Sequence, residues 1–169
     1  MALDFSTTLQ NALELIGFRG NYQQFIIHDK EEERNNHDEI IGLYGNAKWK
    51  IIDILNQNYS SVLKDKFDLY NWLNNNTGDE VSYFLNEAGS NVLNHSEFKA
   101  PSGFHLWMGE NGFIIGIEQK GRGFDAELVN ENMVKKNQGS AFQFFRNCKS
   151  KIFFDDHKDA RMVFMATHF

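Results

Sequence analysis

The fold is decided by residues 103–118, which read GFHLWMGENGFIIGIE. Two apolar, β-prone runs, Gly103 to Met108 and Phe113 to Glu118, lie on either side of the sequence GENG. An Asn-Gly pair between two such runs is a strong signal of a tight turn between antiparallel strands. We therefore expect a β-hairpin here.

A helix is expected just before this hairpin. Thr77 or Asp79 can cap it, and it runs to about His95. Its buried face is marked by apolar residues at helical spacing, namely Val81, Leu85, Ala88 and Val92.

The elements after the hairpin complete an α/β pattern. Helical stretches are expected around 126–134 and 140–148, and a last hairpin pairs 151–154 with 161–166. The order helix, strand, strand, helix, strand, strand predicts a two-layer α/β sandwich in which helices cover one face of a mixed sheet.

The N-terminal part is less regular. Ser6 and Thr7 can cap a short helix that ends at Gly17, and residues 22–27 are typical of a strand. Residues 40–67 show helical spacing in two successive segments. The Asn-rich turn that ends at Gly78 is the sharpest boundary. We therefore divide the chain into an N-terminal helical or mixed extension, residues 1–76, and a domain of residues 77–169, which can pack together as one domain.

Composition excludes several classes of function. The 169 residues carry a net charge of −6, and a protein of this charge repels the phosphate backbone of nucleic acids. The single cysteine, Cys148, can form no intrachain disulfide. No apolar run is long enough to span a bilayer, and the N-terminus lacks the features of a signal peptide. The expected location is the cytoplasm, without a membrane or nucleic-acid partner.

The helix before the hairpin carries the first candidate site residues. Glu87, Asn91, Asn94 and His95 fall along one polar stripe. An amide oxygen such as that of Asn91 can ligate Mg²⁺, and a carboxylate such as that of Glu87 can deprotonate a hydroxyl or water. A polar stripe is equally typical of any amphipathic helix, so this pattern alone leaves both interpretations open.

Two glycine-containing segments follow at the ends of predicted elements. Gly121 and Gly123 come directly after the second strand, where glycine lets the backbone turn tightly and approach a ligand. Gly139 and Ser140 open a helix, and the exposed amides of a helix N-terminus suit phosphate. A plain turn and an ordinary helix cap are the structural alternatives.

In this order and at these distances, the three segments resemble the motifs of the histidine-kinase-like (GHKL) ATPase superfamily. Residues 85–95, LNEAGSNVLNH, resemble its N-box in the form found in bacterial anti-sigma factors and switch-protein serine kinases. Residues 119–125, QKGRGFD, resemble its Asp-x-Gly-x-Gly-Phe box, and residues 139–145 resemble its second glycine box. The resemblance covers about residues 79–169.

The resemblance implies a role for each matching residue. Glu87 would be the general base and Asn91 the Mg²⁺ ligand. The adenine pocket would be formed by Gln119, Gly121 and Gly123, and the phosphates would lie near Gly139 and Ser140. Two positions depart from the family pattern. Gln119 stands where the family has its adenine-reading Asp, and the second glycine box keeps only Gly139 as a glycine.

The implied function is regulatory. It is an ATP·Mg²⁺-binding domain that binds a protein partner, of the sigma-factor or anti-anti-sigma kind, and that phosphorylates a Ser or Thr of a partner if it is active. The resemblance also implies a homodimer. Two alternatives stay open: a non-catalytic interaction module that kept the fold and lost the nucleotide, and an unrelated fold with a different small-molecule site.

Overall fold

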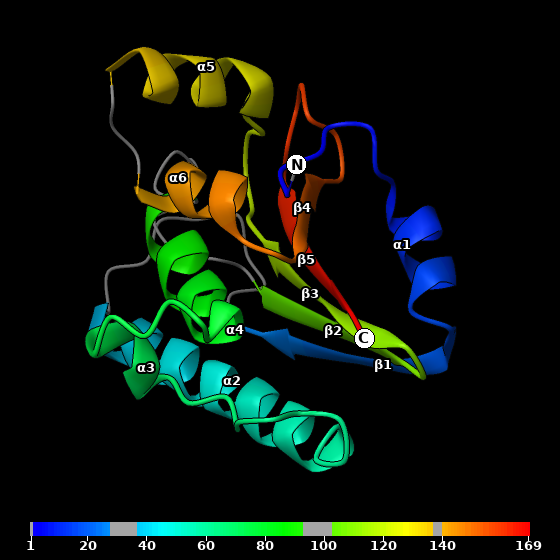
Figure 1. Cartoon of the computed structure of the whole chain (residues 1–169). Helices are drawn as coiled ribbons and strands as arrows, with labels where there is room; N and C mark the ends of the chain where they lie inside the picture. Colours follow the sequence, from blue (N-terminus) through cyan, green and yellow to red (C-terminus); the bar gives the residue numbers. More distant parts are fainter. Residues whose placement is uncertain (1, 28–36, 93–102, 137–139) are drawn as a thin grey trace.

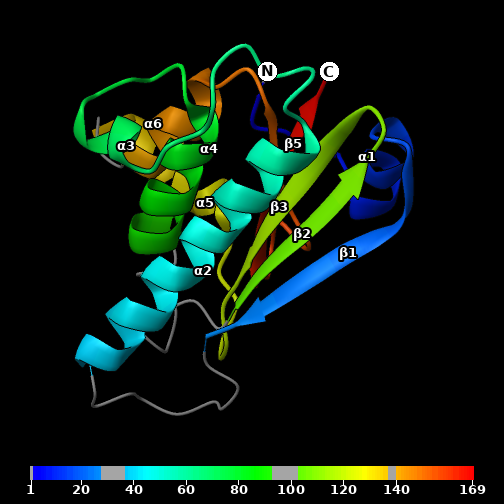
Figure 2. The ribbon, with the colours of Figure 1, turned by 90° about the horizontal axis from the view of Figure 1, so that it is seen from below.

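The computed structural model describes residues 2–27, 37–92, 103–136 and 140–169, without the side chains of 37–41, 89–92 and 140. Figure 1 shows one sheet with most of the helices gathered on one side of it, and Figure 2 shows the long helix α2 crossing that side. The coarse prediction of an α/β fold in which helices pack on a sheet is confirmed.

The sheet has five strands in the order β1-β2-β3-β5-β4. Their bounds are β1 Phe18–Ile26, β2 Gly103–Gly109, β3 Gly112–Glu118, β4 Lys151–Phe154 and β5 Met162–His168. Every neighbouring pair is antiparallel, so the prediction of a mixed sheet is wrong. Ile26, at the end of β1, pairs with Gly103, at the start of β2, so the helical connection returns the chain to the end of the sheet that it left. Such a connection makes the two strands antiparallel.

Both predicted hairpins are confirmed. β2 and β3 pair in full register from Gly103↔Glu118 to Gly109↔Gly112, which leaves a two-residue turn at Glu110 and Asn111. β4 and β5 form the last hairpin. The two helical stretches between the hairpins are α5 Ala126–Lys136 and α6 Ser140–Asn147.

The helix before the first hairpin begins as α4, Glu80–Tyr83, with the Asp79 carboxylate capping Ser82 N. It continues as η1, Phe84–Val92, which has π-helical hydrogen bonding. Leu85 and Ala88 are fully buried, as their spacing predicts. Short π-helical turns often occur at functional sites.

The N-terminal residues belong to the same sheet and core as the rest. Thr8, rather than Ser6 or Thr7, caps α1, Leu9–Leu15, because the Thr8 hydroxyl accepts from Asn11 N. α1 is followed by Gly17, whose φ of 68° favours glycine. β1 begins four residues earlier than expected and forms one edge of the sheet.

One long helix, α2 His37–Asn58, takes the place of the first predicted helical segment in residues 40–67. The prediction of a second helical segment is wrong, because residues 59–69 form turns and irregular backbone. The Asn56 side chain holds this irregular stretch in place, because it donates a hydrogen bond to Phe67 O and accepts one from Phe67 N. A short helix, α3 Tyr70–Leu73, follows.

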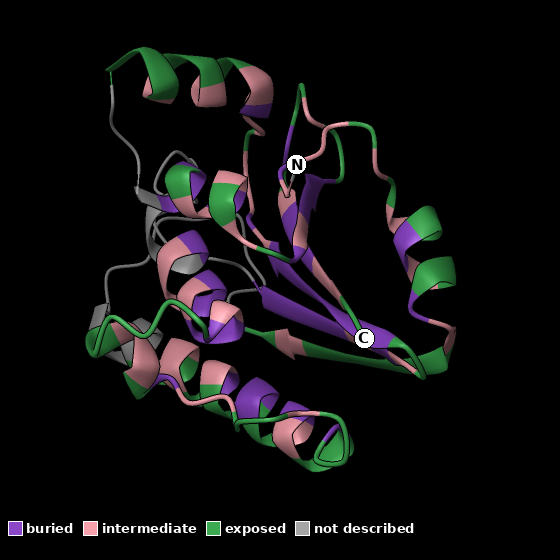
Figure 3. Cartoon of the chain, viewed as in Figure 1, coloured by how far each residue is buried: buried purple, intermediate pink, exposed green. Residues whose placement is uncertain are grey.

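The central strands of the sheet are covered on both faces, unlike the prediction of helices on one face only, whereas the edge strand β1 is mostly exposed. The larger core joins alternate residues of β2 and β3 to α2, η1 and α6; it includes Phe104, Leu106, Ile115, Ile51, Leu55, Phe84 and Phe145. The smaller core lies on the other face, where α1 packs on Ile114, Phe153 and Phe164. Figure 3 shows that β3 is buried along its length while α5 is mostly exposed.

Candidate functional site

The predicted nucleotide site involves η1 and the segment after β3. Glu87 lies on η1, half-buried, and its carboxylate accepts a hydrogen bond of 3.1 Å from the indole Nε1 of Trp72 on α3. The backbone of Asn91 belongs to the same helix, one turn further on. The side chains of Asn91 and Ser140, and all of Gly139, Asn94 and His95, lie outside the described residues, so the predicted metal ligand and phosphate-binding end are not placed.

Gln119 follows β3 directly and is buried, with 1% of its surface exposed. Its amide nitrogen Nε2 donates to two backbone carbonyls, Arg122 O at 2.9 Å and Ala160 O at 3.2 Å. The amide oxygen Oε1 is buried, and no hydrogen-bond donor among the described residues reaches it.

This geometry fixes what Gln119 can recognise. A primary amide carries two N–H groups, and both are used on carbonyl oxygens. The orientation of the amide is set as well, because a flipped amide would place an oxygen against two carbonyl oxygens. Gln119 therefore presents a hydrogen-bond acceptor only, and it cannot donate to a ring nitrogen at the same time. Leaving such an acceptor buried and unpaired costs about 1–3 kcal/mol.

The two glycines after Gln119 have local structural reasons. Gly121 has a φ of 89°, in the region that favours glycine, and its carbonyl accepts from Arg161 Nε. A Cβ on Gly123 would lie 2.7 Å from the carbonyl carbon of Asp159, in the β4–β5 connection. Phe124 then exchanges two backbone hydrogen bonds with Ala160. The glycine segment is therefore fixed against the β4–β5 hairpin.

A half-buried lysine lies beside η1. Lys48 of α2 donates to Asn86 Oδ1 at 2.7 Å, and its ammonium lies 4.4 Å from the centre of the Tyr44 ring. Burial lowers the pKa of Lys48 to about 8. No sequence pattern marks Lys48, because it lies on a helix whose packing against η1 only the tertiary structure reveals.

Sequence reasoning also missed a polar chain on the α1 face of the sheet. Tyr22 of β1, His105 of β2 and Glu118 of β3 are joined by two hydrogen bonds of 2.6 Å each. Alternation along the strands places Glu118 on this face, whereas the next residue, Gln119, begins the glycine segment.

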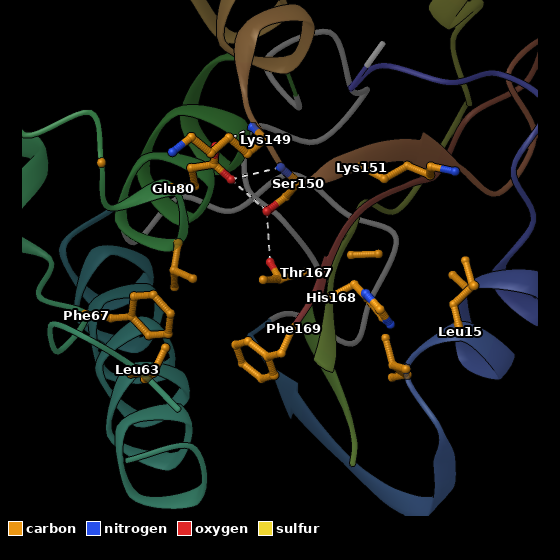
Figure 4. A pocket seen from close by; sticks show the side chains of 15 residues that line it. Leu15, Leu63, Phe67, Glu80, Lys149, Ser150, Lys151, Thr167, His168 and Phe169 are labelled. Carbon is orange, nitrogen blue, oxygen red and sulfur yellow. Dashed lines mark hydrogen bonds between the residues drawn. The ribbon is translucent and has the colours of Figure 1, made fainter. Parts of the chain in front are cut away.

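A cavity of about 480 Å³ lies at the other end of β3. Its wall includes Thr167 and His168, which pair with Phe113 and Gly112 at the start of β3, whereas Gln119 follows the end of that strand. Figure 4 shows apolar side chains on both sides of it, with Phe67 and Leu63 across from Leu15.

Three polar side chains of this cavity, those of Glu80, Ser150 and Thr167, are already joined by hydrogen bonds. The Glu80 carboxylate accepts from the backbone N–H groups of Lys149 and Ser150 and from the Ser150 hydroxyl, as Figure 4 shows for Ser150. Ser150 Oγ gives its proton to Glu80, so Thr167 Oγ1 is the donor of the 2.9 Å bond between the two hydroxyls. These bonds join α4 to the start of β4 and have a structural purpose.

Among the described residues, no helix is long and apolar enough to cross a membrane. No family model matches the chain, and no curated protein or solved structure matches it either.

Proposed function

We propose that the chain is a regulatory adenine-nucleotide-binding domain of the histidine-kinase-like type, similar to anti-sigma factors and switch-protein serine kinases. The observation that carries the proposal is the unpaired, buried Oε1 of Gln119. It lies at the position where the resemblance implies an adenine-reading side chain. The exocyclic amino group of adenine is a donor, and it would satisfy this acceptor; adenine binding would require the segment that covers Gln119 to open, because this residue is 1% exposed.

The order of elements supports the same proposal. The helix with Glu87, the β2–β3 hairpin that ends at Gln119, the helices α5 and α6 and the β4–β5 hairpin follow one another in the order that the resemblance implies. Asn91 would hold Mg²⁺, which neutralises phosphate charge when bound. Glu87 would accept the proton of a partner's Ser or Thr hydroxyl as that oxygen bonds to the terminal phosphorus of ATP, while the bond from that phosphorus to the ADP leaving group would break. The Trp72 indole would hold Glu87 in place through the bond between them.

The second candidate is a protein-interaction module of the same fold without nucleotide. The packing of Gly123 against Asp159 favours it, because that glycine is required whether or not a ligand is bound. The half-buried Glu87 carboxylate also accepts a hydrogen bond from the Trp72 indole, which gives this side chain a structural role of its own.

Nucleotide-dependent unfolding separates the two. The protein is titrated with ATP and Mg²⁺ while the melting temperature is followed; a ligand at a hundredfold excess over its dissociation constant stabilises the folded state by about 2.7 kcal/mol. Inosine triphosphate is the matched control. Its base carries a carbonyl where adenine has the amino group, so it would place an acceptor oxygen against the acceptor Oε1 of Gln119. Stabilisation by ATP but not by inosine triphosphate supports the proposal, provided that Asn91→Ala loses this stabilisation. No stabilisation at millimolar ATP leaves the interaction module or an unrelated fold.

A further inference from the structure

The chain Tyr22–His105–Glu118 has the geometry of a hydroxyl–imidazole–carboxylate relay. Tyr22 Oη lies 2.6 Å from His105 Nδ1, and His105 Nε2 lies 2.6 Å from Glu118 Oε2. The three residues come from neighbouring strands, so the rigid pairing of β1, β2 and β3 sets their distances.

The partners of the imidazole define its neutral, base-competent form. The hydrogen bond from His105 lowers the pKa of Glu118, so this residue is a carboxylate and accepts from Nε2–H. In the neutral imidazole, a proton on Nε2 leaves Nδ1 as the acceptor for the Tyr22 hydroxyl. A hydroxyl that donates to an imidazole oriented by a carboxylate is the general arrangement of an activated nucleophile.

The surroundings hold the imidazole and leave Tyr22 partly exposed. His105 is 8% exposed, and its ring contacts those of Tyr22 and Trp107, which also contact each other. The absence of a side chain at Gly116 leaves room for this cluster of rings, because a Cβ there would lie 3.1 Å from the Trp107 ring. Tyr22, on the edge strand, is 42% exposed.

We infer that Tyr22 is a reactive hydroxyl that accepts acyl groups from activated acyl donors, with His105 as its general base. In the reaction, a bond forms between Tyr22 Oη and the acyl carbon, and the bond from that carbon to the leaving group breaks. The Tyr22 proton passes to His105 Nδ1 and then to the leaving group, while Glu118 stabilises the transient imidazolium. The inference does not rest on the proposed nucleotide binding.

Acetylation by N-acetylimidazole tests it, with the site and rate of modification followed by peptide mass spectrometry. Tyr70 is the internal control: it is more exposed, at 59%, and among the described residues its hydroxyl makes no hydrogen bond. Burial raises the pKa of Tyr22, so without the relay Tyr22 would react more slowly than Tyr70. With the relay, Tyr22 reacts at least about tenfold faster, since general bases contribute about 10²–10⁴-fold.

The variant His105→Phe keeps the stacked ring and removes the base. It should bring the Tyr22 rate below that of Tyr70 without changing the Tyr70 rate. If this variant does not fold, Glu118→Gln serves instead: it keeps an acceptor for Nε2–H but removes the charge, and it should slow Tyr22 by about tenfold. Glu110→Gln, on the exposed β2–β3 turn, is its matched control. The inference is overturned if Tyr22 reacts no faster than Tyr70, or if the variant that folds leaves its rate unchanged.

Discussion

Replacing Gln119 by Met should remove nucleotide recognition at almost no cost in stability. Met has nearly the length and volume of Gln, so packing is preserved. The substitution loses two hydrogen bonds, to Arg122 O and Ala160 O. At about 0.5–1.5 kcal/mol each, this loss is about 1–3 kcal/mol.

An equal gain opposes this loss. The substitution also removes the unpaired Oε1, whose burial costs about 1–3 kcal/mol. Neither carbonyl is left without a partner, since Ala160 O still accepts from Phe124 N and Arg122 lies at the surface, where water reaches it. The free energy of unfolding without ligand should therefore change by less than about 1 kcal/mol.

Urea unfolding measures the free energy of unfolding without ligand. The ATP-dependent shift in melting temperature measures nucleotide recognition. Gln119→Glu is the contrasting variant of the same length: a carboxylate there has no hydrogen for either carbonyl and buries a charge, which should cost about 3–5 kcal/mol. A loss above about 2 kcal/mol in Gln119→Met would mean that Oε1 is satisfied in the folded protein. An unchanged ATP shift in Gln119→Met would refute the role of Gln119 in reading adenine.

Three further predictions follow from local geometry. Gly123→Ala should lower the free energy of unfolding by about 1–3 kcal/mol in urea, because the new Cβ overlaps the Asp159 backbone; Gly45→Ala, in a helix with nothing within 4 Å, should raise it by about 0.5–1 kcal/mol. Burial raises the pKa of the Cys148 thiol to about 12, so iodoacetamide at pH 8 should alkylate the folded protein at least about a hundredfold more slowly than the protein in urea; equal rates would contradict this. The imidazole hydrogen bond lowers the pKa of Glu118 below 4.5, so its contribution to stability is complete above that pH and lost as pH falls through the lower, folded-state pKa. Glu118→Gln should make the acid limb of the stability curve less steep, and an unchanged limb would show that this bond contributes nothing.

The short, locally coded elements were predictable from the sequence. The β2–β3 and β4–β5 hairpins, α5, α6 and the buried face with Leu85 and Ala88 lie where periodicity and turn residues indicate. The sequence patterns of these elements involve residues close together in the chain. The local conformational preference of these residues agrees with the structure that they adopt in the fold. The prediction of a second helix in residues 40–67 was wrong, because the apolar residues there pack in an irregular stretch that Asn56 holds in place.

The sequence by itself determined the α/β class, the two hairpins and the positions of Glu87 and Gln119 on their elements. Only the tertiary structure decided that the sheet is antiparallel throughout, that α1 covers its second face and that Gln119 presents an acceptor alone. It also joined Tyr22, His105 and Glu118, which lie far apart in the chain. Strand pairing is set by how long connections return across the sheet. The free atom of the Gln119 amide is set by two carbonyls together, that of Arg122 nearby in the chain and that of Ala160 from the β4–β5 connection. Both features depend on contacts between residues far apart in the sequence, so a local pattern alone does not encode them.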